Sequence, residues 1–412
     1  MLLMNKKTGQ IYIVGMDGGI DSAVAAYLLK KQGHSPIGVA VTYHEDDGDF
    51  KELISPFLPD ELDRIKQLCQ ILEIPFYATN ASELYFEEVV EKTVSARLTG
   101  NSFVPNVGKV SVILKTLISK MTGLSAVKVS TGHYAKVLRN QTTGQLNVYV
   151  ANDIAEDDSF YISSLSSEVL ENIYFPLSEL KEEEVLKISK LIPFDFKLDK
   201  KQRRLDRHNF MNSEGLAKFV EKYSATSLRK EGQVYNFFDG STIGEHLGIH
   251  QFFRGQKKIP LKSKAQIDKE LVVSRIVPAN GMIFLDKESR LYFTHLYVSN
   301  FICDKNLNRS VPMIANIMLG ARKQMHSCEV FFKNNGTLFI KLKEELKDFI
   351  SRGAYIVLYN KIGVGARVIG GGIVRYSAFY DENEELAQYP KTKDQEDNEE
   401  DKNKQKKKDL GF

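Results

Sequence analysis

The sequence predicts an α/β fold in which a doubly wound parallel sheet is followed by a small central domain and a C-terminal antiparallel β-barrel. Three observations lead to this prediction. Strand-like apolar runs alternate with helical patterns between residues 11 and 180, which is typical of a parallel sheet with helices on both faces. The segment 194–261 is basic and mixed in pattern. The segment 266–379 consists of short strands broken by turns, as in a small barrel.

The 412 residues allow two or three domains with a sizeable core in the first. We expect the domains to span 1–195, 196–265 and 266–380, with a charged tail at 381–412. The tail lacks periodicity and has few apolar residues, which predicts disorder.

Individual elements of the first domain follow from the hydrophobic pattern. Concentrations of β-branched and aromatic residues predict strands at 11–15, 36–43, 74–79 and 127–134. Apolar residues at helical spacing predict helices at 22–31, 60–72 and 110–121. Gly33 is a candidate C-cap of the first helix. Farther along, a helix is predicted at 213–223, and the Asn334-Asn335-Gly336 turn predicts a β-hairpin.

A glycine-rich turn joins the first predicted strand to the first predicted helix. It contains Gly15, Gly18 and Gly19, and it carries Asp21 and Ser22. Glycines let backbone N–H groups approach a ligand closely, and a helix N-terminus attracts an anion. The spacing fits the dinucleotide and Walker patterns poorly. Because ligands of such sheets lie at the carboxyl ends of the strands, we expect the segment 131–133 to converge on this phosphate-binding turn.

The composition of the chain indicates which broad class of protein it belongs to. The content of 42% hydrophobic and 26% charged residues is that of an ordinary globular protein. We find no apolar run long enough for a bilayer and no signal-peptide pattern, so we expect a cytoplasmic protein without a membrane partner. The three widely spaced cysteines predict neither disulfides nor a metal site.

Charge gives a weaker indication of a partner. The net charge of +3 is small, but basic residues cluster at 197–207, and clustered charge is typical of a phosphate-backbone contact. From that run alone, a solvated linker is the favoured interpretation. For the acidic turn 44–47 a solvated turn is favoured over a Mg²⁺ site. The glycines 370–372 are expected to serve strand packing.

The turn resembles the S-G-G-x-D-S loop of ATP pyrophosphatases, and the whole of residues 10–378 resembles the bacterial tRNA-specific 2-thiouridylase family. GMDGGIDS stands where the family has GMSGGVDS. Further along, the chain matches the family's GHYA, DQSYF…FPL, central-domain and GGGII motifs, at 132–135, 158–177, 248–258 and 368–374.

The resemblance implies that ATP, with Mg²⁺, activates the C2 oxygen of the wobble uridine in tRNA, which sulfur then replaces. It implies a nucleotide site made of Gly15, Met16, Asp17, Gly18, Gly19, Ile20, Asp21, Ser22, Val41, Gly132 and His133. For His133, a strand-capping role is the alternative to a ligand role. The implied tRNA contacts are Asp157, Asp158, Arg254, Lys257, Arg322 and Lys323. A sulfur-relay protein is an implied partner only of an active enzyme.

The chain departs from the family where sulfur chemistry takes place. Transfer of sulfur needs a persulfide on one cysteine and a second cysteine to resolve or deliver it. The family's first cysteine, in PNPDVLCN, corresponds to Ser111, and the acidic residue of that motif corresponds to Gly108. The second cysteine falls near His208 in a stretch without cysteine. Cys69 lies in an apolar helical pattern and is expected to be a core residue.

Other departures concern binding. Asp17 replaces the leading serine of the loop and puts a negative charge where phosphates lie, although a bridging Mg²⁺ reverses that effect. Glu156 and its two acidic neighbours replace a Lys-Asp-Gln segment that touches tRNA, and Ala354 replaces a barrel glutamine.

Two hypotheses follow from these observations. The first is a non-thiolating family member that keeps an RNA- or partner-binding scaffold, and the missing cysteines favour it. The second is an active ATP-dependent tRNA 2-thiouridylase that uses an external sulfur donor, and the intact loop and GHYA motifs keep it open.

Overall fold

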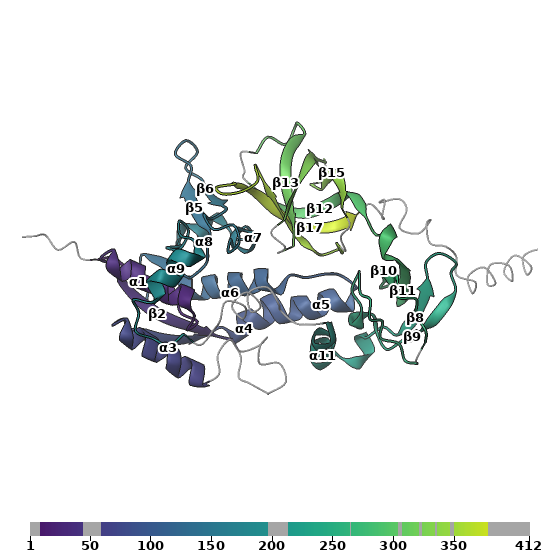
Figure 1. Cartoon of the computed structure of the whole chain (residues 1–412), viewed down its shortest axis with the longest axis horizontal. Helices are drawn as coiled ribbons and strands as arrows, with labels where there is room; N and C mark the ends of the chain where they lie inside the picture. Colours follow the sequence, from purple (N-terminus) through teal and green to yellow (C-terminus); the bar gives the residue numbers. More distant parts are fainter. Residues whose placement is uncertain are drawn as a thin grey trace, which may run out of the picture.

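The computed structural model describes residues 9–43, 59–196, 213–263, 265–303, 307–320, 324–333, 336–346 and 350–377. It contains a parallel sheet, a central four-stranded sheet and a closed barrel (Figure 1). The helices α5 and α6 reach from the parallel sheet toward the central sheet. The barrel lies on one side of this pair and α11 on the other (Figure 1).

The parallel sheet has the strand order β3-β2-β1-β4-β7. Its strands are β1 (Ile11–Gly15), β2 (Ser35–Thr42), β3 (Phe76–Asn80), β4 (Lys128–Ser130) and β7 (Ile173–Tyr174). One face, with Val14 and Ala40, packs on α1 (Ile20–Lys31), α3 (Pro59–Ile71) and α9 (Glu182–Ser189). The opposite face, with Ile13 and Val39, packs on α6 (Pro105–Ser119). Alternation along the strands thus buries both faces, and the doubly wound prediction is confirmed.

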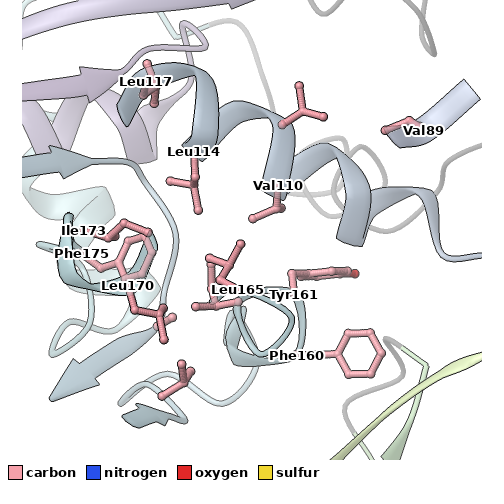
Figure 2. Close-up of a cluster of buried hydrophobic side chains, with 14 of the residues drawn as sticks. Val89, Val110, Leu114, Leu117, Phe160, Tyr161, Leu165, Leu170, Ile173 and Phe175 are labelled. Atoms are coloured by element: carbon pink, nitrogen blue, oxygen red, sulfur yellow. The ribbon is translucent and has the colours of Figure 1, made fainter. Parts of the chain in front are cut away.

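The helix α6 is the main cover of the second face. Val110 and Leu114 point from α6 toward Leu165 and its neighbours (Figure 2). Those neighbours belong to the region of α7 (Ser159–Ile162) and α8 (Ser167–Glu171). The sequence pattern placed the start of this helix at residue 110. The structure starts it at Pro105, a residue well suited to the first turn of a helix.

Three elements before α6 were not predicted. They are α4 (Ser82–Tyr85), a π-helical turn η1 (Phe86–Glu91) and α5 (Lys92–Leu98). A short hairpin, β5 (Lys136–Arg139) with β6 (Leu146–Tyr149), also interrupts the α/β alternation. The barrel contacts this hairpin, since the Val150 N–H donates to the Ala366 carbonyl over 2.9 Å.

The central domain is larger than the sequence predicted. It contains α11 (Ser213–Tyr223), η2 (Thr226–Leu228), η3 (Ile249–Gln251), η4 (Glu288–Arg290) and a sheet of order β10-β11-β8-β9. The strands are β8 (Gly232–Asn236), β9 (Thr242–His246), β10 (Leu271–Val277) and β11 (Met282–Lys287). The predicted start of the barrel at 266 is therefore wrong, because β10 and β11 pair with the central sheet. Apolar content alone did not reveal which sheet they join.

The barrel begins at Phe293 and closes in the order β12-β15-β14-β13-β16-β17. Its strands are β12 (Phe293–Cys303), β13 (Met313–Leu319), β14 (Met325–Phe332), β15 (Leu338–Leu346), β16 (Tyr355–Tyr359) and β17 (Val368–Ser377). The predicted hairpin is confirmed, because Val330 pairs with Ile340 in antiparallel register. A Cβ on Gly370 would lie 2.3 Å from the Ile302 carbonyl, so close strand packing requires glycine there, as expected.

The predicted charged tail at 381–412 and the basic run at 197–207 lie outside the described residues. Within the described ranges, none of the helices combines the length and the apolar character needed to span a bilayer.

Candidate functional site

The glycine-rich turn lies between β1 and α1, at the carboxyl edge of the parallel sheet. The Met16 N–H donates to the Val39 carbonyl over 2.9 Å, which holds the turn against β2. Gly18 has a φ of +78°, a left-handed conformation that favours glycine. Gly19 is the N-cap of α1, has extended backbone angles and, as a glycine, has no side chain that could cap the helix. The turn therefore brings the Gly19 N–H and the first turn of α1 to the carboxyl edge of the sheet.

The Asp17 carboxylate lies at this edge. Its Oδ1 atom accepts a hydrogen bond from the Gly19 N–H over 2.9 Å and from the Ser22 hydroxyl over 2.5 Å. The Ser22 Oγ also lies 3.4 Å from the Asp17 N–H. These donors are the kind that a phosphate group uses, and in this conformation they are taken by the carboxylate of the loop itself.

The second wall of the site comes from the segment after β4. A Cβ on Gly132 would lie 2.7 Å from the Ser22 nitrogen and from Asp21, so Gly132 packs directly on the first turn of α1. The Tyr134 hydroxyl donates to Asp21 Oδ1 over 3.1 Å. The expected convergence of the two segments is confirmed.

The other members of the predicted nucleotide site have ordinary structural surroundings. His133 Nδ1 lies 2.7 Å from the Thr131 hydroxyl, which orients the ring. Ile20 and Val41 are buried, and Gly15 packs closely on α6, since a Cβ there would lie 2.9 Å from the end of the Leu117 side chain. That these residues bind a nucleotide stays a prediction.

Tyr43 extends the site toward α6, and the sequence analysis missed it. It stacks on Tyr85 with ring centroids 4.4 Å apart, and the Lys109 Nζ lies 6.0 Å from its ring. Burial raises the pKa of Tyr43 well above its usual range, and Tyr85 and the negative charge of Asp17 add to the shift. The position of Tyr43 directly after β2 was its only signal in the sequence.

The motif on α6 carries Ser111 in place of the family's cysteine. Ser111 is half-buried on α6, one turn from Gly108. A Cβ on Gly108 would lie 2.8 Å from the Glu88 carbonyl oxygen of η1. The helix α6 therefore packs on η1 through a position where the family has an acidic side chain. The structure offers that side chain no space.

Asp157 and Asp158 are inside the protein, with 5% and 4% of their surface exposed. Asp157 accepts hydrogen bonds from the Ala151 N–H over 2.8 Å and from the Ser159 hydroxyl over 2.6 Å. Asp158 accepts one from the Tyr134 N–H over 2.9 Å. In this structure both carboxylates are buried and hydrogen-bond to backbone N–H groups, and that they contact tRNA stays a prediction.

The other residues predicted to contact tRNA do not gather at one place in the described structure. Arg254 is buried and donates to the Ile350 carbonyl over 2.9 Å, which ties the central domain to the barrel. Lys257 is exposed and lies 2.7 Å from Glu288. The other predicted positions, His208, Arg322, Lys323 and the acidic turn 44–47, lie outside the described residues. In the described part of the chain, no group of three or more His, Cys, Asp or Glu residues is arranged to hold a metal ion.

Comparisons with known proteins agree with the order of the domains. Residues 10–205 match the tRNA methyl transferase HUP domain, and residues 293–374 match the aminomethyltransferase β-barrel domain. The tRNA-specific 2-thiouridylase MnmA of Clostridium perfringens is 26% identical over 372 residues, covering 88% of this chain and 97% of that protein. MnmA of Mycoplasmopsis synoviae is 28% identical over 383 residues, covering 90% of this chain and 96% of that protein.

Among solved structures, a 4-thiouridine synthetase–RNA complex with bound ATP aligns with a TM-score of 0.30 and 14% identity. The alignment covers 45% of this chain and 41% of that one, and a likeness of this extent says nothing about substrate.

Proposed function

This chain belongs to the tRNA-specific 2-thiouridylase family, and we propose that it is a member without thiolation activity that uses the family scaffold to bind RNA. The observation that carries the proposal is Ser111, which stands on α6 where the family has its persulfide-carrying cysteine. A serine hydroxyl cannot carry a persulfide, and the stretch around His208 contains no cysteine that could act as the partner.

Two of the three thiols of the chain, Cys69 and Cys328, support the same proposal. Cys69 is buried between α3 and β2, and burial raises its pKa to about 12. Cys328 is inside the barrel, where burial also raises its pKa to about 12. Since the thiolate is the nucleophile, both are inert at neutral pH. Cys303 lies at the end of β12, where the Arg309 Nη2 atom is 3.3 Å from its sulfur.

The state of the glycine-rich turn supports weak nucleotide binding. Asp17 takes up the Gly19 N–H and the Ser22 hydroxyl, both of which a phosphate of ATP would need. Activation of uridine needs ATP with Mg²⁺, so a loop that already holds a carboxylate disfavours the first step of the family reaction. The neighbouring Gly132, Tyr134 and Asp21 keep the shape of the site.

The test is a thiolation assay with the purified full chain. The protein is incubated with ATP, Mg²⁺, unmodified tRNA and sulfide as the external sulfur source, and the nucleosides are analysed by mass spectrometry. We expect no 2-thiouridine above a protein-free control. Formation of 2-thiouridine would contradict the proposal and establish the alternative, an active 2-thiouridylase that uses an external sulfur donor.

Two further measurements complete this experiment. Fluorescence anisotropy with labelled tRNA measures binding directly, and the RNA-binding part of the proposal requires saturable binding that weakens with salt. Nucleoside analysis of tRNA from a deletion strain gives the cellular result. We expect 2-thiouridine to stay at the level of the parent strain, because the proposal gives this chain no part in its formation.

A further inference from the structure

The outer surface of the barrel carries a cluster of rings that the site described above does not use. We propose that this cluster is a stacking surface for unpaired nucleotides of RNA. It consists of His295 and Tyr297 on β12, Phe339 on β15 and Phe331 on β14, with Lys333 beside them; we refer to these five residues as the aromatic face. This inference rests on the proposed function, since it locates where the scaffold contacts RNA.

The register of the strands places these rings side by side. Tyr297 is paired with Phe339, and Phe339 is paired with Phe331, so the three rings form a row across β12, β15 and β14. Ring centroids are 5.2 Å apart for Tyr297 and Phe339, and 5.8 Å apart for Phe331 and Phe339. His295 continues the row along β12, 5.5 Å from Phe339.

These rings are not needed to fill the barrel. The interior is filled by alternate residues of the same strands, among them Leu296, Val298, Val330 and Ile340. The rings lie on the opposite side of the strands and are partly buried, with part of each ring residue open to solvent. Cross-strand ring pairs stabilise a sheet on their own account, so the row by itself does not indicate a ligand. The lysine charge beside the rings is the observation that points to a ligand.

Lys333 places an ammonium group over the row. Its Nζ lies 4.7 Å from the centroid of Tyr297 and 5.9 Å from that of Phe339. Lys341 is paired with His295 and adds a second cation along β15. One carboxylate, Glu329, is paired with Lys341 on the other side and offsets part of that charge. Exposed rings interleaved with lysines bind single-stranded nucleic acid, because bases stack on the rings and phosphates meet the cations.

The experiment uses the full chain and two fluorescein-labelled RNA probes, a single-stranded oligouridine of about 12 nucleotides and a duplex of equal length. Tyr297→Leu removes the ring and keeps apolar bulk, and Lys333→Ala removes only the cation. Ile362→Ala and Lys361→Ala are the matched controls, because both residues are exposed in the turn that joins β16 to β17. Thermal melts establish that each variant is folded.

We expect Tyr297→Leu to weaken single-strand binding by about fivefold or more and to leave duplex binding unchanged, since only unpaired bases can stack. Lys333→Ala should weaken binding to both probes and reduce the salt slope by about one phosphate contact. The control variants should bind like the wild type.

Several results would overturn the inference. If wild type binds the single strand while Tyr297→Leu and Lys333→Ala bind equally well, RNA contacts another surface, and the proposed function still stands. If Tyr297→Leu loses duplex and single-strand binding equally, stacking is not the mode of recognition. If the wild type binds no RNA, the proposed function itself fails. Because Lys333→Ala leaves every ring in place, it keeps the inference testable even where a ring variant unfolds.

Discussion

At the scale of single residues, Asp17 is the substitution with the clearest physical consequence. Its carboxylate sits at the N-terminus of α1 and accepts two hydrogen bonds there. A negative charge in this position stabilises a helix by about 0.3–1 kcal/mol at an exposed site. We therefore predict that Asp17→Ser strengthens ATP binding and slightly lowers the unfolding temperature without ligand. Calorimetric titration with ATP and a thermal melt measure the two effects.

The variant Asp17→Asn separates the effect of the negative charge from the effect of the hydrogen bonds that the side chain accepts. Its amide oxygen still accepts from the Gly19 N–H, while the negative charge is gone. If charge repulsion dominates, Asn improves ATP binding nearly as much as Ser does. If the hydrogen bonds accepted at position 17 dominate, only the Ser variant improves ATP binding. Tight ATP binding by the wild type, or no gain in either variant, would contradict the prediction.

At the scale of elements, the contact between α6 and η1 bears on whether the acidic residue of the family motif can be reintroduced. Gly108 lies against the Glu88 backbone with no space for a Cβ. We predict that Gly108→Ala lowers the free energy of unfolding by about 1–3 kcal/mol, because crowding outweighs the gain in helix propensity. Gly108→Asp should cost more, because it also buries a carboxylate beside a carbonyl oxygen.

Urea denaturation of the three proteins measures this difference. An alanine variant as stable as the wild type would mean that α6 and η1 separate easily, and that the acidic residue of the motif can be reintroduced. Lys120→Ala at the exposed C-cap of α6 is the matched control, and it should change the stability little.

Sequence patterns predicted some elements of this fold and missed others. Apolar patterns and the glycine-rich turn were enough to predict the strands β1 to β4 and the helices α1, α3 and α11. For α11 the predicted bounds are the same as the observed ones. They did not reveal η1, because a π-helical turn of six residues has no apolar periodicity of its own to recognise. Nor did they reveal that Asp157 and Asp158 are buried, since local sequence does not show which backbone N–H groups surround a carboxylate.

At the scale of the whole molecule, polar contacts fasten the barrel to the first domain. The Ser159 and Tyr359 hydroxyls lie 3.0 Å apart in a buried position, and Ser159 also donates to Asp157 over 2.6 Å. We predict that Tyr359→Phe lowers stability by about 0.5–1.5 kcal/mol. A double-mutant cycle with Ser159→Ala measures the coupling, and additive effects of the two variants would show that this contact does not fasten the domains.

A second junction, between the first and the central domain, should make stability depend on pH. His250 is buried, its Nε2 lies 3.0 Å from Glu221, and its carbonyl accepts from Arg97 over 2.8 Å. Burial lowers the pKa of His250 below its ordinary value, Arg229 and Arg97 lower it further, and Glu221 opposes the shift. His246, also buried, has a pKa lowered chiefly by burial.

Because the folded pKa is below the unfolded value of 6.5, the unfolded chain binds more protons at low pH. The stability contributed by neutral His250 is therefore complete above pH 6.5 and is lost as the pH falls below it. We predict a lower unfolding temperature at about pH 5.5 than at about pH 7.5, and a smaller difference in His250→Gln. His326→Gln in the barrel strand β14 is the control and should keep the full difference. An unfolding temperature that rises on acidification would mean that Glu221 holds His250 as a cation, so that this junction is an ion pair and not a neutral hydrogen bond.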